Sequence, residues 1–231
     1  MATHLLKAFQ RNGVEAVVVN SRSLEGLEPD SDIIILAVSD SAIGEVAANI
    51  AAGVPDFKGI AAHTAGSVAM DSLQPFFRNF GVFYPLQTFS KDMEIPDFRD
   101  IPVFVEGNSA ETADTLEELA GILSDNVYRL DSEAREKLHL ASVFACNFTN
   151  ALYGVAHELL EETGVPFSAL LPLVDRTAAK VHDASPADCQ TGPARRGDKR
   201  VTDRHIQLLS SRPELAKLYE LVSTIISSSS H

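Results

Sequence analysis

The first 130 residues alternate between short apolar runs and amphipathic segments. The segment Asp32–Val38 (DIIILAV) is apolar at every position after its acid, which is typical of a strand buried on both faces of a parallel sheet. Helical spacing between such runs indicates helices that cross from one parallel strand to the next. We therefore predict strands at Val14–Val19, Asp32–Val38, Gly59–His63, Gly81–Tyr84, Ile101–Val105 and Asn126–Leu130, and helices at Thr3–Arg11, Ser41–Ala52 and Ala110–Leu123.

From Asp131 onward the pattern is helical, with no strand signal. The periodicity predicts helices at Ser132–Glu162, Phe167–His182, Val201–Ser211 and Pro213–Ile226, with a polar loop over residues 184–200. The change in character indicates two domains. We expect an α/β domain over residues 1–130 and an all-helical domain over residues 131–231.

Charge and composition narrow the class of ligand. The formal net charge of −13 argues against nucleic acid and anionic membranes as partners, because both attract clustered lysine and arginine. No apolar run reaches the roughly 18 residues of a membrane-spanning helix. Cys146 and Cys189 match no zinc or redox spacing. We expect a cytoplasmic protein without a metal site, acting on a small molecule.

Polar loops follow the predicted strands, and open α/β sheets bind ligands at the carboxyl ends of their strands. After Val14–Val19 the loop contains Ser21 and Arg22. A guanidinium group pairs well with the 2′-phosphate of NADP, whereas an acid there would favour NAD. The alternative is that Ser21 and Arg22 form a solvated turn.

The next strand ends supply more candidate cofactor contacts. They are Val38, Ser39, His63, Thr64, Gly66 and Ser67. Gly66 would let the backbone approach a ligand closely, and His63 could donate a hydrogen bond or titrate near neutral pH. Pro85 and Gln87 follow the strand after that.

The long predicted helix carries polar residues within an apolar stretch. At about 100° per residue, His139 and Cys146 lie within about 20° of each other, Asn150 shares their stripe and Asn147 is about 80° away. Buried histidines and amides need hydrogen-bond partners. This stripe therefore faces a ligand or another polar surface. The alternative is a dimer interface, or a core histidine whose hydrogen bonds are satisfied within the protein.

The loop Thr191–Asp198 (TGPARRGD) carries two arginines between flexible glycines. Through Thr191, Gly192 and Arg195 it could clamp an anionic substrate. The alternative is a charged surface loop.

Taken together, these segments resemble a known family. The chain is similar to NADP oxidoreductases that join a Rossmann-like domain to a helical C-terminal domain of unknown function, relatives of pyrroline-5-carboxylate reductase and of the 6-phosphogluconate and β-hydroxyacid dehydrogenases. The matching segments are Ser21–Arg22, Asp32–Ile43, His63–Ser67, Tyr84–Ser90, His139–Asn147 and Thr191–Asp198.

The resemblance implies a Rossmann-like, mostly parallel sheet, an all-α domain of the 6-phosphogluconate-dehydrogenase type, and homodimers formed through that helical domain. It implies that the strand-end residues line NADP. Apart from the resemblance, we take His139 as the candidate acid/base and Asn147, on the flank of its stripe, as a second candidate catalytic residue. The implied substrate contacts are Pro85, Gln87, Asn150, Thr191, Gly192 and Arg195.

Three features depart from the family. Its members open with a strand and a glycine-rich turn before the helix that here begins at Ala2, so we expect this chain to lack that strand and loop and to bind NADP weakly. Tyr84 stands where a histidine is usual. Val143 stands where dehydrogenase relatives have a lysine four residues before the asparagine, so the resemblance assigns no proton donor.

These features favour an oxidoreductase that transfers hydride between NADP and a small carbonyl, imine, alcohol or amine. The alternative is a non-catalytic ligand-sensing or dimerisation module that has lost the phosphate loop. A serine hydrolase is disfavoured because the chain has no Gly-x-Ser-x-Gly elbow.

Overall fold

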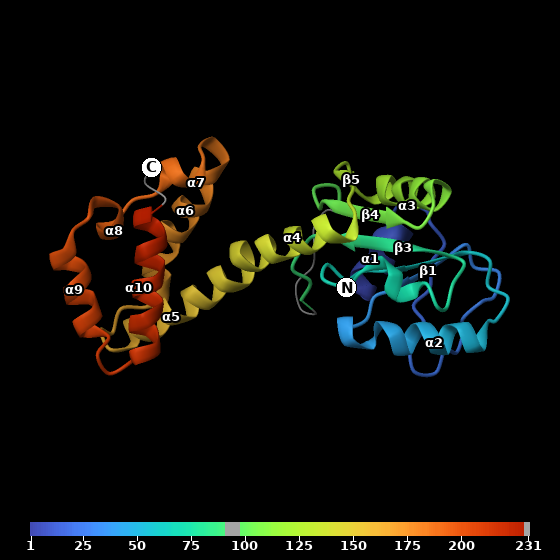
Figure 1. The fold of residues 1–231 in the computed structure, drawn as a ribbon, viewed down its shortest axis with the longest axis horizontal. Coiled ribbons are helices and arrows are strands. Elements are labelled where there is room, and N and C mark those ends of the chain that lie inside the picture. Colours follow the sequence, from blue (N-terminus) through green and yellow to red (C-terminus); the bar gives the residue numbers. More distant parts are fainter. Residues whose placement is uncertain (91–97, 229–231) are drawn as a thin grey trace. The chain divides into compact units, whose positions relative to one another are not determined.

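The computed structural model describes residues 1–90 and 98–228. It divides into two compact units, Met1–Asn150 and the part from Ala151 onward (Figure 1). The predicted boundary near residue 130 coincides with the end of the last strand. The first compact unit extends beyond it because the helix that follows, α4 (Ser132–Ser142), packs against the sheet through its first turns.

The first unit is built on a five-stranded sheet in the order β1-β2-β3-β4-β5. The strands are β1 (Ile33–Leu36), β2 (Ile60–His63), β3 (Asn79–Pro85), β4 (Val103–Gly107) and β5 (Val127–Arg129). All neighbours are parallel except β3 and β4, which are antiparallel. The prediction of a Rossmann-like, mostly parallel sheet is confirmed.

Helices cover both faces of this sheet (Figure 1). One core joins α1 (Ala2–Arg11) and α3 (Ala110–Leu123) to the sheet through Phe9, Phe83 and Leu116. The other joins α2 (Ile43–Gly53) to the opposite face through Ile43 and Ala61. Successive residues of β2 therefore enter different cores, as the two-residue period of a strand requires.

The strand predicted at Val14–Val19 is wrong. These residues form no regular structure, and the side chains of Val17 and Val18 are 73% and 54% exposed. In the described residues, β1 pairs only with β2 and no strand lies beside residues 14–19. Residues with high β-propensity do not form a strand when no neighbouring strand is available to hydrogen-bond with their backbone.

The long helix predicted at Ser132–Glu162 is interrupted. It comprises α4, a π-helical segment η3 (Val143–Phe148) and α5 (Thr149–Glu161). A π turn contains more residues than an α turn, so the 100° spacing that aligned His139, Cys146 and Asn150 does not hold across η3. The prediction of one regular helix is wrong over these residues.

The second unit is helical, as predicted. It contains η4 (Phe167–Leu170), α6 (Leu171–Asp183), α7 (Pro186–Cys189), α8 (Pro193–Arg196), α9 (Lys199–Leu208) and α10 (Pro213–Ser228). The predicted loop over residues 184–200 is wrong in part, because Ser185 caps α7 and Gly197 ends α8 in a left-handed conformation. Among the described residues, no helix has the length and apolar character needed to cross a membrane.

Candidate functional site

The loops after β1 and β2 meet at the carboxyl edge of the sheet. Ser67 Oγ donates a hydrogen bond to Asp40 Oδ2 at 2.5 Å, and the Thr64 N–H donates to the carbonyl of Leu36 at 3.3 Å. The strand register pairs Leu36 with His63, so both strands end side by side. The predicted cofactor segments, Val38–Ser39 and Thr64–Ser67, are therefore neighbours.

His63 lies at the end of β2 and is fully buried. Its Nδ1 accepts a hydrogen bond from the Ala65 N–H at 3.2 Å, which leaves the proton of the neutral ring on Nε2. Burial and then the Arg135 guanidinium lower the pKa of His63 to about 4, although the Ala69 backbone and the Asp40 carboxylate oppose this. The expectation that His63 titrates near neutral pH is therefore wrong, because desolvation disfavours the imidazolium ion.

Nε2 of His63 has no hydrogen-bond partner within the described residues. The Ala69 backbone raises the pKa of His63, but its contact with this atom does not have the full geometry of a hydrogen bond. His63 therefore remains a neutral N–H donor at the end of β2.

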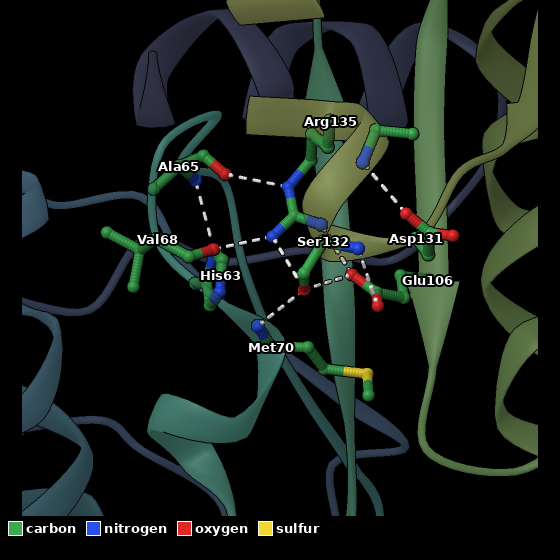
Figure 2. A network of polar contacts seen from close by, with 9 residues as sticks. His63, Ala65, Val68, Met70, Glu106, Asp131, Ser132 and Arg135 are labelled. Carbon is green, nitrogen blue, oxygen red and sulfur yellow. Dashed lines mark hydrogen bonds and ion pairs between the residues drawn. The ribbon is translucent and has the colours of Figure 1, made fainter. Parts of the chain in front are cut away.

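A buried arginine fixes the loop that follows His63 (Figure 2). Arg135, on α4, is 1% exposed and pairs with the Glu106 carboxylate of β4. It also donates to the carbonyls of Val68, at 2.5 Å, and Ala65, at 3.4 Å. Five N–H donors in a rigid fork allow one guanidinium group to bind a carboxylate and two backbone carbonyls together.

Ser132, at the start of α4, completes this network (Figure 2). Its N–H and hydroxyl donate to the two Glu106 oxygens at 2.9 and 2.8 Å. Its Oγ accepts a hydrogen bond from the Met70 N–H at 3.0 Å. The backbone from Ala65 to Met70 is thereby held between β4 and α4.

Sequence reasoning missed Arg135 and Glu106. Fully buried arginine is rare, so an arginine in a helical pattern is normally assigned to the solvent face. The available signal was weak: Glu106 directly follows an apolar strand, and Asp131 caps α4 by accepting a hydrogen bond from the Ala134 N–H at 2.8 Å. Neither observation identifies an ion pair between residues 29 positions apart.

Tyr84 and His139 meet beside this loop. Tyr84, near the end of β3, is 7% exposed, and its hydroxyl oxygen lies 3.1 Å from His139 Nδ1. The rings pack edge to face with centroids 6.2 Å apart. A Cβ atom on Gly66 would lie 2.5 Å from His139 Nδ1 and 2.8 Å from Tyr84 Cζ. The close approach that Gly66 permits is therefore to these two side chains.

The two predicted catalytic residues, His139 and Asn147, do not lie together as Tyr84 and His139 do. His139 joins the sheet-edge cluster, whereas Asn147 is exposed and lies eight residues further along, within the π-helical segment η3. Asn150 is also exposed, at the start of α5. Pro85 is buried beside Tyr84, and Gln87 is exposed two residues later.

The remaining predicted contacts lie elsewhere. Arg22 is exposed after the irregular Val14–Val19 segment, and its N–H donates to Asn20 Oδ1 at 2.9 Å while Ser21 is half-buried. Thr191, Gly192 and Arg195 belong to the second unit, around the start of α8. Their contacts with a cofactor or substrate stay predictions.

A cavity of about 640 Å³ lies at the other edge of the sheet, lined by residues 29–32 and 53–59. These residues precede β1 and β2, so the cavity is at the amino ends of the strands. Because open α/β sheets bind ligands at the carboxyl ends, the candidate site is the polar cluster around Asp40, Ser67, Tyr84 and His139.

The buried ion pair makes a stability prediction. Arg135→Met leaves the Glu106 carboxylate buried without its cation, and we expect the free energy of unfolding to fall by about 3–5 kcal/mol. Urea denaturation followed by circular dichroism measures the change. Lys137→Met, which removes an exposed pair with Glu133, is the control and should change it by less than about 1 kcal/mol. Equal effects of the two substitutions would contradict the described network.

Comparisons with known proteins agree with this architecture. The family model described as "Domain of unknown function (DUF2520)" matches residues 101–226 of the 231 residues. The crystal structure of a "putative NADP oxidoreductase" from Bacteroides fragilis is 40% identical, with a TM-score of 0.86 over 98% of this chain and 94% of that chain. None of the curated proteins matches the chain.

Two more distant structures share the fold. A Thermotoga maritima protein is 22% identical, with a TM-score of 0.70 over 88% of this chain and 80% of that chain. An imine reductase from Myxococcus stipitatus, solved in complex with NADP+, is 16% identical, with a TM-score of 0.61 over 99% of this chain and 90% of that chain. With the family model matching more than half of the sequence, the chain belongs to the DUF2520 family.

Proposed function

We propose that this protein is an NADP-dependent oxidoreductase that transfers hydride to or from a small carbonyl, imine, alcohol or amine. The observation that carries the proposal is His139, a histidine held beside the carboxyl ends of parallel strands by Tyr84. Such an edge is where nucleotide cofactors bind, and histidine is the usual acid/base residue in neutral solution. The name given to the Bacteroides fragilis relative supports the same class of reaction.

The donor set at this edge fits the uncharged half of a nicotinamide nucleotide. Ser39 and Ser67 provide hydroxyl groups suited to a ribose, and Val38, Thr64 and Gly66 complete the two loops. The Asp40 carboxylate hydrogen-bonded to Ser67 would repel a phosphate but tolerates a neutral or cationic ring. We therefore assign the nicotinamide ribose to these loops and the 2′-phosphate of NADP to Ser21 and Arg22.

When bound, the nicotinamide supplies or accepts the hydride. The chain's own residues orient the reactants and handle the proton. His139 is the proposed acid/base residue, and Pro85 and Gln87 lie next to Tyr84 on the same edge. Asn147, Asn150, Thr191, Gly192 and Arg195 are proposed contacts that act when a substrate is bound.

We also propose that this 231-residue chain binds NADP weakly by itself. Among the described residues, no strand is followed by a glycine-rich turn and a helix, the arrangement whose backbone amides bind a pyrophosphate. The same observation favours the second candidate function, a non-catalytic ligand-sensing or dimerisation module.

Cofactor preference tests the assignment of Arg22. In titrations followed by nicotinamide fluorescence, NADPH should bind more tightly than NADH, and Arg22→Ala should reduce that preference at least tenfold, since a charge-assisted hydrogen bond contributes about 1.5–3 kcal/mol. Arg78→Ala, at the amino end of β3, is the matched control and should leave the preference unchanged. Equal affinity of the original chain for the two cofactors would remove the proposed role of Arg22.

A chain extended at Met1 by an apolar strand and a glycine-rich turn should bind both NADPH and NADH more tightly than the original chain.

Turnover tests the enzymatic function. Absorbance at 340 nm should report NADPH oxidation with a member of a panel of small ketones, aldehydes and cyclic imines, measured at millimolar cofactor. His139→Ala should lower kcat/KM by about 10²–10⁴-fold, the usual contribution of general acid–base catalysis. His157→Ala, an exposed histidine on α5, is the control. Cofactor binding without turnover in either direction across the panel would favour the non-catalytic module.

We propose a second copy of this chain as the partner of the helical unit. In residues 151–228, Leu209 is the one hydrophobic side chain that is buried. Four exposed residues of α10 form a stripe at helical spacing: Leu218, Leu221, Val222 and Ile225. A continuous apolar stripe of this kind requires cover, and two identical stripes related by a twofold axis can cover each other.

The oligomeric state tests this partner. Sedimentation equilibrium should give a dimer for the original chain and a shift to monomer for Leu221→Glu, because the new carboxylate would be buried in the interface. Glu220→Lys changes the charge on another face of α10 and should leave the dimer intact. A monomer for the original chain at micromolar concentration would reject the proposal.

A further inference from the structure

His139 depends on one side chain for its orientation. Its Nδ1 lies 3.1 Å from the Tyr84 hydroxyl, and the two rings meet edge to face. The His139 ring is half-buried, and among the described residues the hydrogen bond found for this ring is the one at Nδ1, with none at its other nitrogen, Nε2. One nitrogen is therefore engaged within the protein, and the other remains available to a ligand.

The Tyr84 hydroxyl is the more enclosed member of the pair. Burial, followed by the Asp40 carboxylate, raises the pKa of Tyr84 above its ordinary value of 10, with the Arg135 guanidinium opposing the change. The phenol therefore keeps its proton at neutral pH. A group that holds its proton so firmly is a poor proton source for a substrate but a constant hydrogen-bond donor.

The direction of the hydrogen bond follows from the available partners. Within the described residues, the only acceptor found for the Tyr84 hydroxyl is His139 Nδ1. A buried hydroxyl requires such an acceptor. When the phenol donates to Nδ1, the proton of the neutral imidazole must be on Nε2.

We propose that Tyr84 is a positioning residue that donates its hydroxyl hydrogen to His139 Nδ1 and so presents the Nε2–H of His139 to the substrate. A carbonyl oxygen or an imine nitrogen can accept a hydrogen bond from this N–H. The catalytic consequence rests on the proposed oxidoreductase function, whereas the tautomer of His139 is a property of the protein alone. Gly66 contributes to the same arrangement, because a side chain there would clash with the rings of His139 and Tyr84 and push them apart.

The tautomer is measured directly by long-range ¹H–¹⁵N correlation spectra of the imidazole, recorded on the full chain where His139 is neutral. The His139 signals are identified by their loss in His139→Gln. We expect Nδ1 to be unprotonated and Nε2 to carry the proton. Tyr84→Phe should increase the share of the Nδ1–H form about fivefold, the ratio that one ordinary hydrogen bond supports. Tyr128→Phe, at an exposed tyrosine of β5, should change nothing.

A second variant guards against a folding defect in Tyr84→Phe. Gly66→Ala keeps the Tyr84 hydroxyl but places a methyl group 2.5 Å from Nδ1, and it should raise the Nδ1–H share in the same way. A protonated Nδ1 in the original chain would overturn the proposal, as would spectra that both variants leave unchanged.

Kinetics separate this inference from the proposed function. Once a substrate is found, Tyr84→Phe should lower kcat about tenfold with KM within twofold of the original value, whereas Tyr128→Phe should retain both. A chain that turns over no substrate but shows the expected tautomer would reject the oxidoreductase and retain the role of Tyr84 in orienting His139. An active chain with a protonated Nδ1 would support the oxidoreductase and reject the role of Tyr84 in orienting His139.

Discussion

The buried pair of Arg135 and Glu106 determines where the first turns of α4 lie on the sheet. Removing both charges from water costs several kcal/mol for each ion, and their mutual attraction offsets this only when the remaining donors and acceptors are also satisfied. Here the carbonyls of Ala65 and Val68 and the Ser132 hydroxyl satisfy them. The α4 register is thereby fixed, and His139, one turn after Arg135, lies on the same face of the helix.

The same guanidinium group acts on the site electrostatically. It lowers the pKa of both His63 and Tyr84, while the Asp40 carboxylate acts in the opposite direction on each. Burial decides the outcome for the two groups, because it disfavours the charged form of either one. His63 and Tyr84 therefore both stay neutral near pH 7. The described cluster therefore has two neutral hydrogen-bond donors beside one carboxylate.

Much of the fold could be predicted from the sequence, because its signals are local. The helix predicted at Ala110–Leu123 matches α3, where Ser109 caps the first turn and apolar residues repeat at helical spacing. The strand prediction at Val14–Val19 was wrong because strand formation depends on a neighbouring strand as well as on composition. The prediction of a continuous α-helix was wrong at Val143–Phe148 because the regular spacing of apolar residues does not indicate where a turn contains an extra residue.

For the candidate site, the sequence could predict the loops that follow the parallel strands but not the contacts between distant segments. The rule that ligands bind at the carboxyl ends of parallel strands selected the loops at Ser39 and Ser67 as candidates, and polar residues within an apolar helical stretch selected His139. Their roles stay predictions. Arg135, Glu106 and the Tyr84 hydroxyl are defined by contacts between distant segments, which a single sequence does not record. These contacts nevertheless link the two predicted halves of the site. Arg135 holds the strand-end loop and α4 together, so the proposed cofactor loops and His139 form one rigid arrangement. A substitution in this ion pair should therefore shift His139 relative to these loops, although among the described residues neither the Arg135 nor the Glu106 side chain forms a hydrogen bond with His139.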